Sequence, residues 1–196
     1  IWGFLDEGPF KDEKEMRKSF VFQRKASEAS FAIVHGVTER CMGAILLTND
    51  DPKNLTIQLE PPMIQPFREG GKEQLEACYL LMDRLYAYGY RRIQISIDSQ
   101  DAEKRKLAAR LGFTLEGILY KHMVVKECNR DSSVYGLLNN DWKRGARGAL
   151  FRKLYGAAAE RSDLANEKRE EEFDEQERFL KEQRRKDAAD SKEKRV

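Results

Sequence analysis

The chain has 196 residues, of which 40% are hydrophobic and 36% are charged, and its formal net charge at pH 7 is +2. This size predicts one domain with an appendage, and the hydrophobic content is sufficient for one core. No apolar run approaches the roughly 18 residues of a membrane-spanning helix, so we expect no membrane partner. Because acidic and basic residues nearly balance, the composition argues against nucleic acid as a general partner.

Three cysteines, Cys41, Cys78 and Cys128, lie far apart in the sequence and lack the spacing of metal ligands. We interpret them as reduced thiols, which favours a cytoplasmic protein, with a disulfide as the alternative. We expect no metal. The sequence begins at Ile1 rather than methionine, which predicts a fragment whose targeting signals would lie upstream.

The first third of the chain predicts a helix followed by three strands. After a turn at Gly8-Pro9, residues 11–23 are predicted to form a charged helix. Residues 31–34 and 41–48 have the composition of two strands joined as a hairpin. Apolar and polar residues then alternate over residues 55–60, the period of a third strand, which runs into two prolines.

The middle of the chain predicts alternating helices and strands. The strongest helical pattern covers residues 72–88, where apolar side chains recur at helical spacing before Gly89. The remaining predicted elements are a half-buried strand at 93–97, a short helix at 101–111, a long strand at 113–126 and a last strand at 133–138.

The C-terminal part changes composition and becomes predominantly charged from residue 157 onward. Acidic and basic residues at i and i+4, such as Glu177 with Lys181, favour a single solvated helix. We therefore divide the chain into a domain at 1–145 and a charged helical extension at 146–196. The extension is either a solvated tail or a helix through which residues 157–196 contact a protein partner.

A glycine pair, Gly70-Gly71, precedes the strongest helix, between Arg68 and Lys72. The N-terminus of a helix presents unpaired N–H groups and the positive end of the helix dipole, so this junction could hold a pyrophosphate. Taken alone, glycines before a helix usually form only a turn, which is the alternative here.

The order of these elements, together with several short motifs, resembles the GNAT acyl-CoA N-acyltransferase superfamily, in particular its RimJ/RimL-type branch. The resemblance covers roughly residues 2–142 and implies that the family's first strand lies upstream of Ile1. It implies an α/β GNAT fold with a mixed central sheet and helices on both faces, here followed by the long charged C-terminal helix. The motifs are Gly-Tyr-Arg-Arg at 89–92, Ala-Arg-Leu-Gly-Phe at 109–113, Glu-Gly at 116–117, His-Met-Val-Val-Lys at 122–126 and Asn-Arg-Asp-Ser at 129–132.

The resemblance implies that acetyl-CoA is the co-substrate and indicates where it binds. In the family, the strand before the long helix pairs with the pantetheine arm, and the following loop cradles the pyrophosphate. The corresponding residues here are Met63, Ile64 and Gln65 on the strand, Arg68, Gly70, Gly71 and Lys72 in the loop, and Asp101 and Lys104 at the next helix. The sequence departs from the family at the loop, where Glu69, Lys72 and Gln74 replace its glutamine or arginine, its glycine and its small residue. Pro61 and Pro62 also remove two amide donors.

The resemblance further implies acetyl transfer to a primary amine of a protein or small molecule, by direct attack in a ternary complex. Gln58 replaces a carboxylate common in this branch, so we predict Glu60, on the same strand face, as the base. Tyr120 and Tyr135 are the predicted proton donors, with core or rim tyrosines as the alternative. His122 is either a strand histidine or a base. Residues 129–131 are predicted to form a turn with an internal arginine–aspartate pair, with a substrate-side role as the alternative. The alternative function is a catalytically weakened GNAT domain that binds partners through its charged C-terminal helix.

Overall fold

The computed structural model describes residues 10–18, 28–65 and 68–156. The chain divides into one compact unit, Ile1–Leu154, and a second, Tyr155–Val196. The helix predicted for residues 157–196, and its suggested partner role, lie outside the described residues. Leu150 and Leu154 are buried in the core of the first unit, so this unit extends past residue 145. A separate helical extension beyond it stays a prediction.

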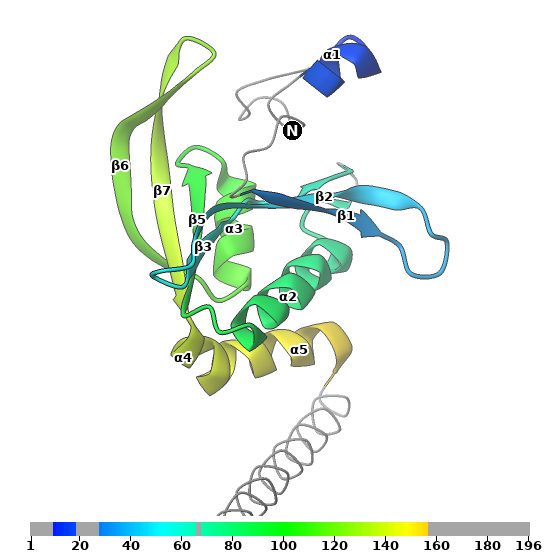
Figure 1. The fold of residues 1–196 in the computed structure, drawn as a ribbon, viewed down its shortest axis with the longest axis vertical. Helices are drawn as coiled ribbons and strands as arrows, with labels where there is room; N and C mark the ends of the chain where they lie inside the picture. Colours follow the sequence, from blue (N-terminus) through cyan, green and yellow to red (C-terminus); the bar gives the residue numbers. More distant parts are fainter. Residues whose placement is uncertain (1–9, 19–27, 66–67, 157–196) are drawn as a thin grey trace, which may run out of the picture. The chain divides into compact units, whose positions relative to one another are not determined.

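The described strands form one mixed sheet in the order β1-β2-β3-β5-β7-β6, with β4 paired to β2 beside this path. β3 and β5 are parallel, and all other neighbours are antiparallel. This arrangement is the predicted mixed sheet (Figure 1). The strands are β1 Ala29–Val34, β2 Cys41–Asp51, β3 Thr56–Leu59, β4 Met63–Ile64, β5 Arg92–Asp98, β6 Thr114–Val125 and β7 Cys128–Leu138.

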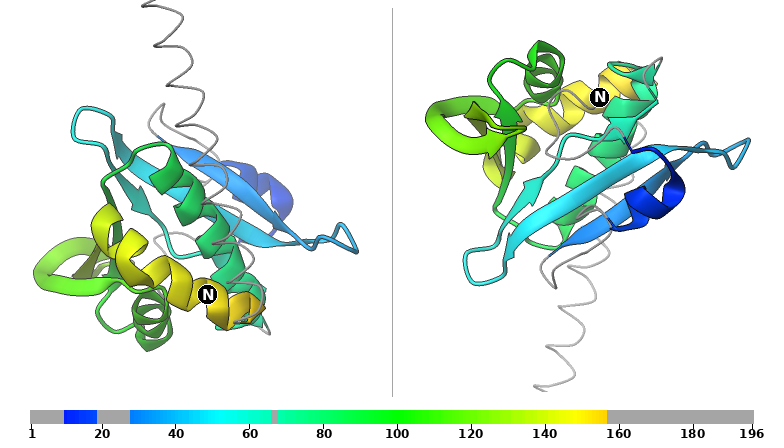
Figure 2. Two further views of the ribbon diagram at one scale, coloured as in Figure 1. Left: turned by 90° about the horizontal axis from the view of Figure 1, so that it is seen from below. Right: turned by 90° about the horizontal axis from the view of Figure 1, so that it is seen from above.

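Helices lie on both faces of this sheet. The helices α2, α3 and α5 contribute buried residues to one core beneath the sheet, whereas α1 lies on the other side of β1 and β2 (Figure 2). None of the described helices is both long and apolar enough to cross a membrane. The helical elements are α1 Glu13–Lys18, α2 Lys72–Ala87, α3 Ala102–Arg110, α4 Asn139–Asp141, a π-helical turn η3 Trp142–Ala146 and α5 Arg147–Tyr155.

The core follows from the two periodicities of the sequence. In β5 the three isoleucines are buried and the residues between them are only partly covered, so one face of the strand packs on helices. In α2 the buried residues Leu75, Cys78, Met82 and Leu85 recur at helical spacing and face that same core. The apolar faces of β5 and α2 therefore turn toward the same core, as their periodicities predicted.

The long hairpin of β6 and β7 corrects one prediction. Residues 129–131 do not form a turn, because β7 already begins at Cys128. The turn lies at Lys126 and Glu127, whose φ angles are 50° and 66°. Two consecutive residues with positive φ are the geometry of a tight two-residue hairpin turn. The start of β7 was not predicted as a strand because its residues are polar. The hairpin arms are largely exposed here, so apolar and polar residues do not alternate.

Candidate active site

The two parallel strands of the sheet, β3 and β5, stop pairing at their carboxyl ends. β3 pairs with β5 over Thr56–Gln58, and past this point the chain turns to β4, which pairs with β2 instead. The helices α2 and α3 begin after β4 and β5 respectively. In open α/β sheets, ligands bind beyond the carboxyl ends of strands that diverge in this way, near the helix N-termini. This place contains the predicted coenzyme residues.

The two prolines lie in a bulge that connects β3 to β4. The N–H of Glu60 donates to Leu46 O at 2.9 Å, and the N–H of Gln65 donates to Met42 O at 3.1 Å. Between the pairs Leu46–Glu60 and Ala44–Met63, the two prolines oppose the single residue Ile45. A bulge residue is outside the ladder, so the missing N–H groups leave no pairing site on β2 unfilled.

The edge of β4 that faces away from β2 is the surface available to an extended ligand. N–H groups alternate in direction along a strand, so the N–H of Ile64 points away from β2 while those of its neighbours point toward it. Met63, Ile64 and Gln65 therefore form a short edge that could pair with a pantetheine arm.

Hydrogen bonds within the protein occupy the backbone groups of the loop before α2. The buried side chain of Gln74, 1% exposed, accepts a hydrogen bond from Gly70 N–H at 2.8 Å and approaches the carbonyl of Pro62 at 3.4 Å. The N–H of Gly71 donates to the carbonyl of Arg68 at 3.0 Å, and the Arg110 guanidinium donates to Gly70 O at 2.6 Å. Both glycine amides of the predicted pyrophosphate loop are thus engaged within the protein.

The first turn of α2 keeps donors for an anion. No side chain caps this helix at Gly71, and the first intrahelical bond runs from Leu75 N–H to Gly71 O. Within the described residues, the N–H groups of Glu73 and Gln74 make no intrahelical bond and face the space before the helix. The residues present fit the pantetheine arm at β4 and one phosphate at this turn. A pyrophosphate cradled by the loop glycines requires Gln74 to release Gly70.

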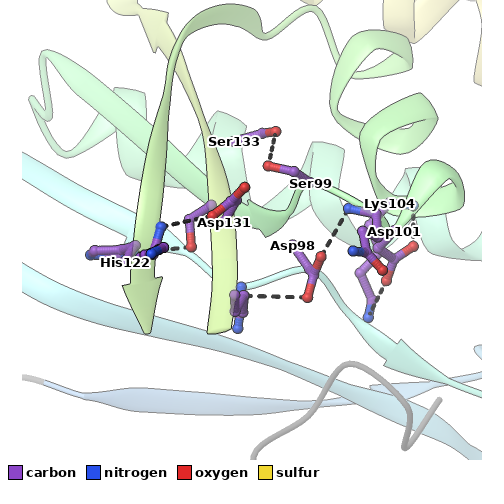
Figure 3. Close-up of polar contacts among 11 residues, drawn as sticks. Asp98, Ser99, Asp101, Lys104, His122, Asp131 and Ser133 are labelled. Atoms are coloured by element: carbon purple, nitrogen blue, oxygen red, sulfur yellow. Dashed lines mark hydrogen bonds and ion pairs between the residues drawn. The ribbon is translucent and has the colours of Figure 1, made fainter. Parts of the chain in front are cut away.

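Asp101 and Lys104 pair with each other at the start of α3 (Figure 3). The Asp101 carboxylate accepts the Lys104 N–H at 3.1 Å and lies 2.9 Å from Lys104 Nζ. Asp101 thus caps α3, as expected for an aspartate before a helix. The ammonium is held beside a buried carboxylate at the helix N-terminus. Its contact with a coenzyme phosphate stays a prediction.

Hydrogen bonds orient the carboxylate of Glu60, the predicted base. Glu60 Oε1 accepts hydrogen bonds from Thr48 Oγ1 at 2.8 Å and from Gln58 Nε2 at 2.7 Å. Gln58 in turn accepts from Asn49 Nδ2 at 3.1 Å. These bonds fix the carboxylate on the sheet face opposite the helical core, because Gln58 and its partner Gln94 alternate with the buried residues of their strands.

The two predicted proton donors do not lie beside Glu60. Tyr135 is 6% exposed and pairs with Ile95, so it faces the core on the other side of the sheet. Tyr120 is 77% exposed on β6, the edge strand farthest from β3. The structure therefore brings none of these three residues together, and their catalytic roles stay predictions.

Polar residues gather at the carboxyl end of β5, where their pairing differs from the prediction (Figure 3). Arg130 forms its ion pair with Asp98, at 3.7 Å, while Asp131 accepts the N–H of Lys121 at 2.7 Å. The predicted internal pair of Arg130 with Asp131 is wrong, because consecutive residues of a strand point to opposite faces. His122 Nδ1 lies 3.0 Å from the hydroxyl of Ser132, a strand contact rather than a free base.

Glu116 and Cys78 have shifted pKa values. The Arg92 guanidinium, hydrogen-bonded to Glu116, lowers the pKa of that carboxyl below its usual range. Burial raises the pKa of the Cys78 thiol to about 12. Cys78 is therefore a protonated core residue at neutral pH and no nucleophile. All three cysteines are unpaired, as expected for free thiols.

A groove of about 770 Å³ lies elsewhere, between the β1–β2 hairpin and α2. Its lining is largely apolar and includes Phe31, Val34 and Leu80. It contains none of the predicted site residues.

No protein-family model and no curated protein matches the chain. Solved structures do. A probable acetyltransferase of the GNAT family from Chromobacterium violaceum is 28% identical, with a TM-score of 0.66 over 72% of this chain and 76% of that one. A GCN5-related N-acetyltransferase from Brucella melitensis is 26% identical, with a TM-score of 0.69 over 76% and 68% of the two chains. RimJ from Mycobacterium smegmatis, in complex with CoA-disulfide, is 17% identical, with a TM-score of 0.61 over 75% of each chain.

The fold is therefore that of the GNAT acetyltransferases. The predicted resemblance to this superfamily, with RimJ/RimL-like proteins among the structural neighbours, is confirmed.

Proposed function

We propose that this protein is an acyl-CoA-dependent N-acetyltransferase that moves acetyl from acetyl-CoA to a primary amine of a protein or small molecule. The observation that carries the proposal is the divergence of β4 from β5, which leaves β4 paired with β2 alone among the described strands, beside the N-terminus of α2. The pantetheine arm would pair with the other edge of β4, and Lys72 and the first-turn amides of α2 would hold a phosphate.

The reaction would be a direct transfer. The amine nitrogen attacks the thioester carbon, the C–S bond breaks, and the thiolate leaves and takes up a proton. Glu60 is the proposed acceptor of the amine proton. Its Oε1 is oriented by Thr48 and Gln58, and Oε2 makes no hydrogen bond within the described residues.

Saturating acetyl-CoA should stabilise the folded protein. Ligand that binds only the native state adds RT ln(1 + [L]/Kd), about 2.7 kcal/mol at a hundredfold excess over Kd. Thermal unfolding with increasing acetyl-CoA measures this shift, and calorimetric titration gives Kd directly. Absence of both heat and stabilisation at millimolar acetyl-CoA would exclude the enzymatic proposal.

Glu60→Gln should lower kcat/KM for the acceptor by about 10² to 10⁴, the usual contribution of a general base, and leave acetyl-CoA affinity unchanged. Initial rates of free thiol release with a panel of peptides and polyamines measure this. The matched control is Glu116→Gln, which removes a carboxylate that is already paired with Arg92. Equal rates for wild type and Glu60→Gln would remove Glu60 from the mechanism.

The second candidate is a catalytically weakened GNAT domain that binds partners. The closed loop favours it, because Gln74 and Arg110 occupy the hydrogen-bonding groups of Gly70. Its interaction element would be residues 157–196, and the acetyl-CoA titration separates the two candidates. The acceptor amine and a cytoplasmic location are likewise proposals.

A further inference from the structure

Arg130 is a largely buried arginine with few partners. Its side chain is 15% exposed, and within the described residues its ionic partner is Asp98. The distance from Nε to Asp98 Oδ2 is 3.7 Å, beyond hydrogen-bonding range, and Nε makes no hydrogen bond. A guanidinium has five N–H donors in a planar fork, so an arginine this buried normally uses several of them.

Neither aspartate close to Arg130 in the fold or the sequence forms a hydrogen bond with it within the described residues. Asp98 Oδ1 accepts the N–H of Gln100 at 2.8 Å, which anchors this carboxylate at the start of the turn into α3. Asp131, next to Arg130 in sequence, accepts the N–H of Lys121 at 2.7 Å. Asp98 thus attracts the guanidinium electrostatically without accepting hydrogen bonds from its N–H groups.

Arg130 lies on the same face of the sheet as Glu60. The register pairs Gln58 with Gln94 and Asp98 with Ser132, and paired residues share a face. Arg130 is two residues from Ser132 and contacts Asp98, so it projects from that same face, away from the helical core. The proposed base and the guanidinium therefore project from the same face of the sheet.

We propose that Arg130 is a specificity residue that binds a carboxylate of the acceptor, so that the substrates are primary amines carrying a carboxylate. The inference rests on the proposed acetyl transfer. An arginine fork matches a carboxylate bidentately, and much of the cost of removing this guanidinium from water is already met in the folded protein.

The position of the carboxylate on the acceptor follows from the sheet. Glu60 directly follows β3 and Arg130 lies on β7, with β5 between the two strands. Two strand spacings are about 10 Å. Glu60 is level with Ser96 and therefore with Val134, and Arg130 lies four residues from Val134, which adds about 13 Å along the strands, so the amine and the carboxylate cannot share one carbon. A peptide with an acidic side chain within the first few residues after its N-terminus meets this requirement.

Matched peptides test the inference. Four peptides with glutamate at one of positions 2 to 5 are each compared with the glutamine version, by kcat/KM with acetyl-CoA and by calorimetric binding without it. We expect wild type to prefer at least one glutamate peptide by about tenfold to a hundredfold, the effect of one charge-assisted interaction. Arg130→Gln should abolish this preference and leave the glutamine peptides unchanged.

Asp98→Asn distinguishes recognition from a structural ion pair. Removing the competing carboxylate should tighten binding of the preferred glutamate peptide, whereas Arg130→Gln weakens it. A purely structural pair would lower thermal stability in both variants and change neither preference.

The inference is overturned if wild type binds each pair equally, or if Arg130→Gln, folded by circular dichroism, keeps the preference. If acetyl-CoA does not bind, acetyl transfer fails, and the binding comparison still decides whether Arg130 recognises carboxylates.

Discussion

Trp142→Ala should destabilise the protein by about 3–5 kcal/mol, the range for deleting a large buried aromatic side chain. Trp142 is 1% exposed and stacks on Tyr86, with ring centroids 5.4 Å apart. Its ring also lies 5.7 Å from that of Tyr79, and its Nε1 donates to Asp83 at 3.3 Å. The substitution removes the contact between η3 and α2 and leaves a cavity that these rings cannot fill.

Urea unfolding followed by circular dichroism measures the loss, with Tyr88→Ala as the control. Tyr88 is exposed at the end of α2, where its ring lies beneath the Arg84 guanidinium, so its removal should cost no more than about 1 kcal/mol. A loss below about 1 kcal/mol for Trp142→Ala would mean that η3 and α5 are not integral to the core.

Local sequence patterns predicted the helices and strands whose apolar residues repeat at the period of the element. The isoleucines of β5 and the apolar stripe of α2 each repeat at the period of their element, so burial of one face followed directly. The same reasoning predicted the start of α3 at Asp101, because the cap that begins a helix requires only neighbours in sequence.

Contacts between distant segments were not predictable in this way. The ion pair of Asp98 with Arg130 depends on the register of β5 against β7, which no local pattern specifies. For the same reason the sequence could not place Glu60 and Tyr135 on opposite faces of the sheet.

The coenzyme loop was hard to predict for a different reason. The substitution of Gln74 for a small residue was visible in the sequence, but its effect depends on where the side chain folds. Gln74 turns back to Gly70 and toward Pro62, twelve residues away. The two prolines, in contrast, looked costly in the sequence and prove harmless to the sheet because a bulge contains them.

Gly43→Ala should weaken acetyl-CoA binding at least tenfold and destabilise the fold by about 1–3 kcal/mol, the range for overpacking. A Cβ at Gly43 would overlap the carbonyl oxygen of Met63 and lie 2.8 Å from Ile64 Cα. Both are backbone atoms of β4, so β4 must move away from β2. The edge proposed to pair with the pantetheine arm would move with it. Calorimetric titration of acetyl-CoA and urea unfolding measure the two effects.

Gly136→Ala is the matched control, because its Cβ would overlap only the mobile ends of side chains. The nearest atoms are the carboxylate of Glu116 and the Arg92 guanidinium, whose Nη1 would lie 2.6 Å away. These form a partly exposed ion pair that can rearrange at a cost of about 1 kcal/mol or less, without moving β4. Acetyl-CoA affinity should then match wild type in Gly136→Ala and fall in Gly43→Ala. Equal affinities in the two variants would place the pantetheine arm away from β4 and remove the main support for acetyl transfer at this edge.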